Sequence, residues 1–272
     1  MARLEDKALN YSREACIVSK DASLSEALRH MKKCKSDRVL LRFKDGSLRG
    51  ITTKRDILWK LATERTRMTE PSSWRISGFM STPLIKGTKE MSVGEAVGLM
   101  AENGITSLPL IENDGETVLF DKFSIAEMLA DDERNVLEIS RTPPVTLRLT
   151  DRLLHARMKL QETGLSIIPV LDDNREFLGV IGIDEVLEVF IEYYETLRES
   201  PKHLTEINNI SVDTAVRLRP PTVNTGSTVG EATSLMLKTG YRGVVVLDNT
   251  GKPVGIITGD ELINYLNSLR TL

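Results

Sequence analysis

The fold is decided by a short stretch that reads GITTKRD at residues 50–56 and returns in altered form three times along the chain. The related stretches read VLFDKFS at 118–124, GVIGIDE at 179–185 and GIITGDE at 255–261. Each begins with apolar residues typical of a strand and leads directly into a second apolar stretch typical of a helix. The sequence therefore predicts, four times, a strand that ends where a helix begins.

The same order of elements precedes each copy. A helix with an apolar stripe contains Ala27, Ala96, Ala156 and Ala232 at matching positions. Short apolar runs predict a leading strand at 16–18, 83–85, 144–147 and 222–223, and first hairpin strands at 39–43, 107–111, 167–171 and 244–247. Return strands are expected at 48–52, 117–120, 178–181 and 254–257, with second helices from near Ile57, Ile125, Val186 and Leu262.

The repeating unit is therefore strand, helix, strand, strand, helix. We place the four units at residues 8–62, 76–130, 137–191 and 210–269, with extra connecting segments at 63–75 and 194–209. Three short strands cannot cover both faces of their own sheet, so neighbouring units must pack in pairs. Four units predict two pairs in an α+β fold.

Composition limits the classes of function. The 272 residues hold 36 basic and 39 acidic side chains, a net charge of -3, which argues against nucleic acid or an anionic membrane surface as the partner. Apolar runs such as Val244–Leu247 are far shorter than the ~20 residues that span a bilayer. Residues 1–10 lack the features of a secretory signal, so we expect a soluble, cytoplasmic protein with no membrane partner.

Metal and redox chemistry are not indicated by the sequence. Two cysteines, Cys16 and Cys34, do not make a disulfide framework, and we interpret them as small apolar residues of a strand and a helix end. Three scattered histidines show no metal-ligand spacing. No glycine-rich phosphate loop of the P-loop or kinase type is present, and no nucleophile and base arrangement stands out, so we predict no catalytic cofactor and no enzyme activity.

The four stretches resemble the cystathionine-β-synthase (CBS) domain, in which a glycine, two aliphatic residues, a hydroxyl residue and an acid mark the strand entering its helix. Residues 50–56 match with one polar replacement, and 255–261 match with Glu261 in place of aspartate. The resemblance implies four βαββα CBS repeats arranged as two Bateman modules that form a disc, similar to the γ subunit of AMP-activated protein kinase. It also implies an adenosine-containing ligand (AMP, ADP, ATP or S-adenosylmethionine), an unknown regulated protein and a possible homodimer.

The strand-to-helix turn in repeat one is the first candidate site. Free backbone amides at a helix start favour phosphate, and Thr53, Lys54 and Arg55 add a hydroxyl and positive charge there. Asp56 is suited to accept hydrogen bonds from ribose hydroxyls. The adenine would lie between aliphatic side chains, with Ile51 on one wall and, by family analogy, the segment from Thr82 to Ile85 on the other.

Repeat four supplies the second candidate site. Its residues are Thr258, Asp260 and Glu261, with the segment from Thr142 to Val145 as the partner wall by family analogy. Arg242 stands where related chains have a basic phosphate ligand. Repeats two and three are weaker candidates, because Ser124 and Gly182 lack the required groups.

Two alternatives remain at this stage. Thr53 with Asp56, and Thr258 with Glu261, also have the spacing of capping boxes, which would stabilise a helix start without any ligand. The degenerate motifs also fit an interaction scaffold whose nucleotide sites have decayed. The leading hypothesis is a regulatory sensor that binds an adenosyl ligand and passes occupancy to a partner.

Overall fold

The computed structural model describes residues 4–61, 73–112, 116–196 and 206–270, and its elements follow the predicted fourfold order. Repeat one contains β2 (Ile17–Ser19), α1 (Leu24–Lys33), β3 (Arg38–Arg42), β4 (Leu48–Thr53) and α2 (Lys54–Lys60). Repeat two contains α3 (Val93–Asn103), β5 (Ser107–Ile111), β6 (Thr117–Asp121) and α4 (Lys122–Met128). Repeat three contains β7 (Leu147–Arg148), α5 (Leu153–Thr163), β8 (Ile167–Leu171), β9 (Phe177–Gly182) and α6 (Ile183–Thr196). Repeat four contains β11 (Thr222–Asn224), α7 (Val229–Thr239), β12 (Gly243–Leu247), β13 (Pro253–Thr258) and α8 (Gly259–Leu269).

Strand pairing joins the repeats into two modules. Within a repeat, the hairpin strands pair antiparallel and the leading strand pairs parallel with the first of them, as β2 does with β3. Two further short strands cross between repeats: β1 (Arg13–Glu14) pairs with β6, and β10 (Arg217–Leu218) pairs with β9. Isolated bridges at Ile51 with Ser81 and Arg141 with Ile256 make the reciprocal contacts. Repeats one and two therefore form one module, and repeats three and four form the other.

Glycines on the return strands make this crossing possible. A β-carbon on Gly255 would lie 2.7 Å from Oγ of Ser140, and one on Gly179 would collide with the carbonyl oxygen of Arg217. The glycine that opens the sequence motif thus leaves room for the leading segment of the partner repeat.

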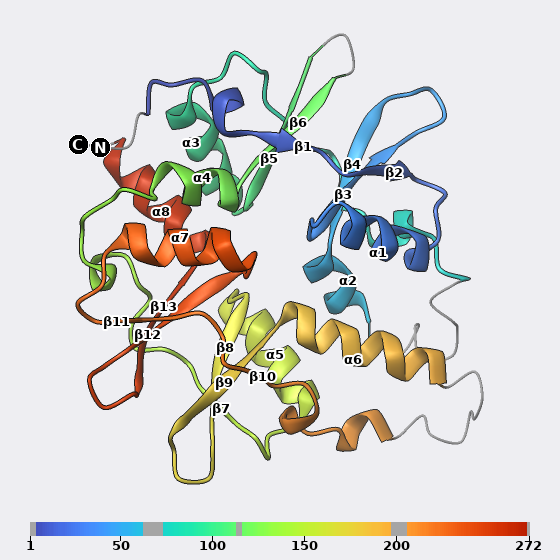
Figure 1. Ribbon diagram of the computed structural model, residues 1–272. Helices are drawn as coiled ribbons and strands as arrows, with labels where there is room; N and C mark the ends of the chain where they lie inside the picture. Colours follow the sequence, from blue (N-terminus) through green and yellow to red (C-terminus); the bar gives the residue numbers. More distant parts are fainter. Residues whose placement is uncertain (1–3, 62–72, 113–115, 197–205, 271–272) are drawn as a thin grey trace.

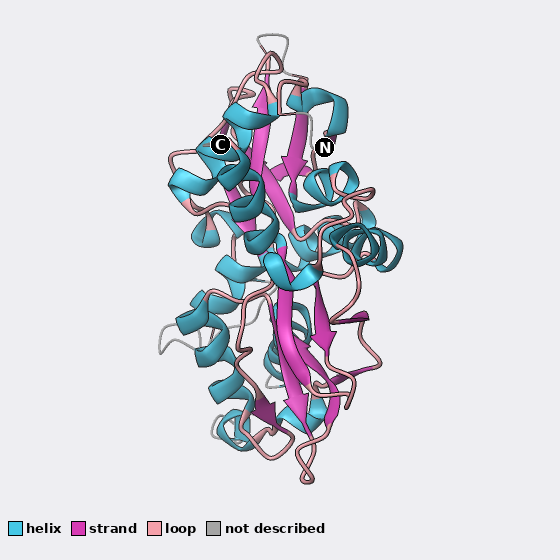
Figure 2. Ribbon diagram, turned by 90° about the vertical axis from the view of Figure 1, so that its left-hand side faces the viewer, coloured by secondary structure: helices cyan, strands magenta, loops and turns pink. Residues whose placement is uncertain are grey.

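Helices hold the two modules together. Helix α2 packs on α6, while α3 and α4 pack on α8 and α7 (Figure 1). One hydrophobic core combines residues of repeats one and three, and a second combines residues of repeats two and four. The broad face in Figure 1 and the narrower profile in Figure 2 show the predicted disc. The α+β fold of two paired modules is confirmed.

Local signals explain where the helices begin and end. Capping boxes form at Ser92 with Glu95 and at Thr228 with Glu231, and the helices α3, α5 and α7 end on left-handed glycines. In repeat one Lys35 takes the glycine's place with a positive φ of 50°. The second helices begin three residues before the first apolar position we predicted, because their polar first turns already belong to the helix.

Two details of the sequence prediction need correction or lie outside the structure. No strand forms at 83–85, where Pro83 lacks a backbone N–H, and within its own repeat the leading segment of repeat two makes a single bridge, between Gly87 and Leu110. The strand predicted at 144–147 is present only from Leu147, as β7. The predicted connections at 63–75 and 194–209 fall mostly on residues 62–72 and 197–205, which are outside the described residues.

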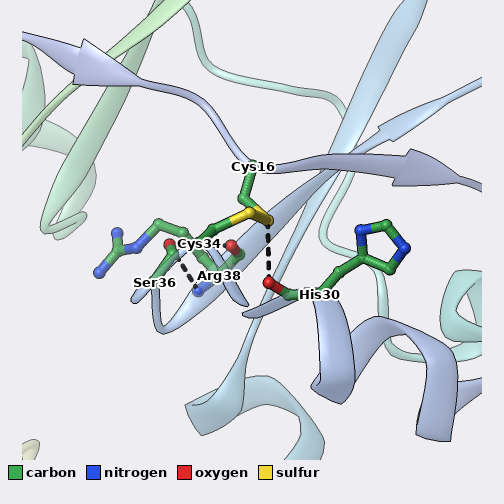
Figure 3. The surroundings of a disulfide bond; sticks show 5 residues. All are labelled: Cys16, His30, Cys34, Ser36 and Arg38. Atoms are coloured by element: carbon green, nitrogen blue, oxygen red, sulfur yellow. Dashed lines mark hydrogen bonds between the residues drawn. A yellow bond between two sulfur atoms is a disulfide. The ribbon is translucent and has the colours of Figure 1, made fainter. Parts of the chain in front are cut away.

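The interpretation of Cys16 and Cys34 as merely small apolar residues was wrong. They form a disulfide (Figure 3). Cys16 lies just before β2, and Cys34 caps the end of α1. Helix α1 runs back beside its leading strand and so brings the two Cα atoms to 6.0 Å, within the range that a disulfide requires. Two cysteines cannot build a framework of several bridges, but they suffice to tie one helix to one strand.

Candidate functional site

A cavity lies between repeats one and two, at the point where β4 turns into α2. Repeat one contributes the end of β4 and the start of α2, and repeat two contributes its leading segment and the loop before β5. Repeat three contributes Ser166, and repeat four contributes Arg242 and Gly259. All four repeats therefore contribute to the lining of this cavity.

Asp56 lies in the wall of this cavity with one oxygen engaged and the other available. Its Oδ2 accepts hydrogen bonds from the backbone N–H of Thr53 at 2.8 Å and from the Thr53 hydroxyl at 2.7 Å. The Thr53 oxygen in turn accepts the backbone N–H of Asp56, which completes a capping box. Among the described residues, Oδ1 of Asp56 makes no hydrogen bond. The capping role and a ligand role are therefore compatible in this carboxylate.

Several of the residues that line the cavity are apolar. Ile51 comes from β4, Pro83 and Ile85 come from the leading segment of repeat two, and Ile105 and Pro109 follow α3. Opposed aliphatic and proline side chains favour a flat apolar group such as a purine base. Thr106 and Ser107 also line the cavity.

Charged residues also line the cavity, and they belong to a buried and half-buried group that we call the central ion cluster: Asp37, Arg38, Lys54, Lys122, Asp184 and Arg242. Asp37 pairs with Arg38 at 2.6 Å, with Arg242 at 2.7 Å and with Lys122. Asp184 pairs with Lys54 at 2.5 Å and with Arg242. Four cations against two carboxylates leave the cluster with two excess positive charges.

Burial and pairing set the ionisation of this cluster. Burial disfavours the charged form of Asp37, but the neighbouring Arg38, Lys122 and Arg242 outweigh it and hold the pKa of Asp37 well below its usual range. Burial opposes the charge on Arg242 too, yet the carboxylates of Asp184 and Asp37 raise its pKa. For Lys122 burial wins over Asp37 and lowers the pKa to about 8. The two arginines therefore supply permanent charge, whereas Lys122 loses its proton near pH 8.

Arg55 extends the positive charge toward repeat three. Its Nη2 donates to the carbonyl oxygen of Gly164 at 2.9 Å and to Oγ of Ser166 at 3.0 Å, and it lies 3.8 Å from Asp260. Burial lowers its pKa from the usual arginine value. Arg55 thus links the first site to the second module.

Most of the residues predicted for the first site line one cavity. Ile51, Thr53, Arg55, Asp56 and Ile85 do so, and Arg242 joins them although we had grouped it with repeat four. Two do not.

Lys54 points away to Asp184 and lines a separate groove. Thr82 is exposed and donates its hydroxyl to the carbonyl oxygen of Arg49 at 3.2 Å.

In the second predicted site, Thr258 and Glu261 are already engaged by protein groups. Oε2 of Glu261 accepts the Thr258 hydroxyl at 2.5 Å and the Thr258 backbone N–H at 2.9 Å, and Oε1 accepts Nε of Arg141 at 2.9 Å. Thr142 lies against β13 near Gly255, and Val145 packs on the first core. Asp260 keeps one buried oxygen, Oδ2, without a hydrogen-bond partner among the described residues.

Sequence reasoning missed Lys122 and Asp37. Lys122 lies in the repeat with the poorest motif, at the position that Lys54 holds in repeat one. Asp37 holds in repeat one the position that Arg242 holds in repeat four. Asp37 follows Lys35 by two residues, and Arg242 follows Gly240 by two residues. Comparing these matched positions would have pointed to Lys122 and Asp37 as the charged counterparts of Lys54 and Arg242.

A second, larger groove lies beyond the central ion cluster. Asp37, Lys122 and Arg242 line both hollows, so the cluster separates them. The wall formed by α6 carries Glu188 and Glu192, and the end of α1 carries Lys32 and Lys35.

No helix within the described ranges is long and apolar enough to cross a membrane. The same residues contain no group of three or more His, Cys, Asp or Glu side chains placed to hold a metal ion.

The comparison with known families identifies the fold. The CBS domain matches residues 10–63, 76–119, 136–192 and 212–268, which make up most of the chain. The chain therefore belongs to the family of CBS-domain proteins, and paired CBS domains are generally regulatory modules that bind ligands.

Solved structures share this fold at low sequence identity. Protein MJ1225 of Methanocaldococcus jannaschii, described as a proposed archaeal homologue of g-AMPK, aligns with a TM-score of 0.81 and 15% identity, covering 95% of this chain and 99% of that one. An uncharacterized conserved protein of Pyrococcus horikoshii aligns with a TM-score of 0.63 and 14% identity, covering 96% and 99%. These similarities establish the fold only.

Curated relatives share parts of larger proteins. A homoserine O-acetyltransferase of Methanosalsum zhilinae is 27% identical over 112 residues, which cover 41% of this chain and 23% of that protein. The meiotically up-regulated gene 70 protein of Schizosaccharomyces pombe is 27% identical over 255 residues, covering 92% of this chain and 32% of that one. This chain thus matches between about a quarter and a third of the length of these two relatives.

Proposed function

We propose that this chain is a regulatory module, without catalytic activity, that senses an adenine nucleotide in the cavity between repeats one and two. The observation that carries the proposal is that three kinds of group line this one cavity. Apolar side chains, the Asp56 carboxylate with an oxygen that has no hydrogen-bond partner among the described residues, and cations of the central ion cluster match the base, the ribose and the phosphate of AMP.

Each part of the nucleotide has a suited partner. The base would lie between Ile51 and Ile85, and the two ribose hydroxyls would donate to Oδ1 of Asp56. The phosphate would meet Arg55, Lys122 and Arg242, with the hydroxyl of Ser166 near them.

The charge of the central ion cluster favours nucleotides over S-adenosylmethionine. The sulfonium of S-adenosylmethionine would be placed near a cluster with two excess positive charges, which opposes its binding. AMP, ADP and ATP each bring negative charge to this cluster. We therefore expect binding to strengthen with phosphate charge as long as the additional phosphates fit.

The position of the site also suggests how nucleotide binding would be communicated to a partner protein. Residues of repeats one and two line this cavity together with Arg242 and Gly259 of repeat four. A bound phosphate would thus contact both modules and would favour the module arrangement that it fits best.

The proposal is tested by calorimetric titration of the full chain with AMP, with ATP and S-adenosylmethionine as competitors. Saturable AMP binding that ATP displaces more effectively than S-adenosylmethionine supports it. Absence of binding by all three would favour the scaffold alternative, in which Thr53 and Asp56 serve only to cap α2. Turnover of the nucleotide by the purified chain would contradict the absence of catalysis.

A further inference from the structure

One position in the leading segments differs between repeat two and the other three repeats. Strand pairing aligns Arg13 with Leu119, Ser81 with Ile51, Arg141 with Ile256 and Arg217 with Val180. The four partners hold the same place on the four return strands. The leading position, which we call the crossing position, therefore holds arginine three times and serine once.

Each crossing arginine meets a carboxylate at the strand-to-helix turn of its partner repeat. Arg13 pairs with buried Asp121 and stacks over the ring of Phe123 at 4.8 Å. Arg141 donates from Nε to Glu261 at 2.9 Å and from Nη1 to the carbonyl oxygen of Thr163 at 2.8 Å.

The contact in repeat three is looser. Arg217 lies 3.9 Å from Glu185 and stacks over the ring of Tyr241 at 4.6 Å. The Tyr241 hydroxyl also donates to Glu185, at 2.9 Å. The crossing arginines thus pair directly with Asp121 and Glu261, whereas Oε1 of Glu185 is held by Tyr241 and lies only within ion-pair distance of Arg217.

The turn of repeat one, which holds Asp56, has no arginine at its crossing position. Ser81 is too short to reach across, and it lines the cavity where Oδ1 of Asp56 makes no hydrogen bond among the described residues. A guanidinium presents parallel N–H donors, and a ribose presents two vicinal hydroxyl donors, so either can satisfy the same carboxylate. The two occupants therefore compete for one position.

We propose that the residue at the crossing position decides which complete turns bind nucleotide: serine opens the site at Asp56, and arginine closes the site at Glu261, the other turn whose motif keeps both the hydroxyl residue and the acid. This inference rests on the proposed function and limits it to one nucleotide per chain. The residues that form a turn's own motif are then insufficient to make a site, because the partner repeat controls access to its carboxylate.

Two reciprocal variants of the full chain test the proposal, with AMP binding and its stoichiometry measured by calorimetry. Ser81→Arg brings an arginine to the Asp56 turn and is expected to weaken AMP binding at least tenfold. Arg141→Ser removes the arginine from the Glu261 turn and is expected to raise the stoichiometry from one AMP per chain to two. Arg148→Ser, which removes an exposed arginine of the same repeat, controls for the loss of charge.

AMP binding by a variant that also lacks Asp56 shows where the new site lies. Asp56→Ala silences the first turn, so any AMP bound by the double variant Asp56→Ala/Arg141→Ser must occupy another site. Thermal unfolding of each variant checks that it is folded, and both substituted side chains are at least partly exposed.

The outcomes separate the two proposals. Loss of binding in Ser81→Arg together with gain in Arg141→Ser supports the role of the crossing position. Unchanged affinity in Ser81→Arg, or unchanged stoichiometry in Arg141→Ser, overturns it while AMP binding by the natural chain still upholds the proposed function. Two AMP molecules bound by the natural chain also overturn it. No binding by the natural chain or by any variant overturns both proposals together.

Discussion

Replacing Asp56 by alanine separates the two roles of this carboxylate. Its Oδ2 caps α2 through the backbone N–H of Thr53 at 2.8 Å, and its Oδ1 is the proposed acceptor for the ribose. Loss of the cap should lower the free energy of unfolding by about 1 kcal/mol. Loss of two hydrogen bonds to a charged group, each worth about 1.5 kcal/mol or more, should weaken AMP binding on the order of 100-fold.

Glu95→Ala provides a matched control. Glu95 holds the same place in the capping box of α3, where it accepts the backbone N–H of Ser92 at the same distance of 2.8 Å, and it does not line the cavity. This variant should show a similar loss of stability and unchanged AMP affinity. Calorimetric titration measures the affinity, and denaturant unfolding measures the stability. The reasoning is refuted if Asp56→Ala loses stability as Glu95→Ala does but binds AMP as the natural chain does.

Three further predictions follow from the buried charges and the disulfide. AMP affinity should fall as the pH rises through about 8, because Lys122 then loses its proton, and Lys122→Met should remove this part of the pH dependence in titrations at pH 7 and 9. Asp37→Asn leaves Lys122 and Arg242 without their shared carboxylate and should lower the free energy of unfolding by about 3 kcal/mol at pH 7. Because the pKa of Asp37 is lowered in the folded chain, its contribution is present above the unfolded pKa and is lost as the pH falls below it; an equal acid sensitivity in the natural chain and Asp37→Asn would contradict this. Replacing Cys16 and Cys34 by serine opens a link between residues 18 positions apart and should cost about 3 kcal/mol in denaturant unfolding under oxidising conditions, with no difference between the two chains once a reductant is added.

The fold was predictable because its signals are local and repeated. Apolar periodicity, capping residues such as Ser92 and helix-ending glycines such as Gly104 each act within a few residues, and four copies reinforce one another. The exceptions also have local causes. Lys35 adopts the left-handed conformation without being glycine, and Pro83 interrupts a run that otherwise has the composition of a strand.

The candidate site was predictable only in part, because its charged side chains come from distant repeats. The motif located Thr53, Arg55 and Asp56, which lie within one turn of helix. Lys122 and Asp37 are 85 residues apart in sequence; Lys122 lies in the most altered copy of the motif, and Asp37 lies outside any copy. Their pairing depends on how the modules pack, which periodicity does not encode.

The direction of Lys54 was equally beyond the sequence. Consecutive residues at a helix start point to different sides, so Arg55 faces the cavity while Lys54 faces the groove beyond it. The disulfide was missed for a related reason. A pair of cysteines 18 residues apart is informative only once α1 is known to fold back along its leading strand.

The central claim is that one cavity, between repeats one and two, holds an adenine nucleotide, and a crystal structure of the full chain grown with saturating AMP tests it most directly. The account predicts one AMP per chain, with its ribose hydroxyls on Asp56, its base between Ile51 and Ile85 and its phosphate near Arg55 and Arg242. An empty cavity at saturating AMP, or AMP bound at the Glu261 turn instead, would contradict it.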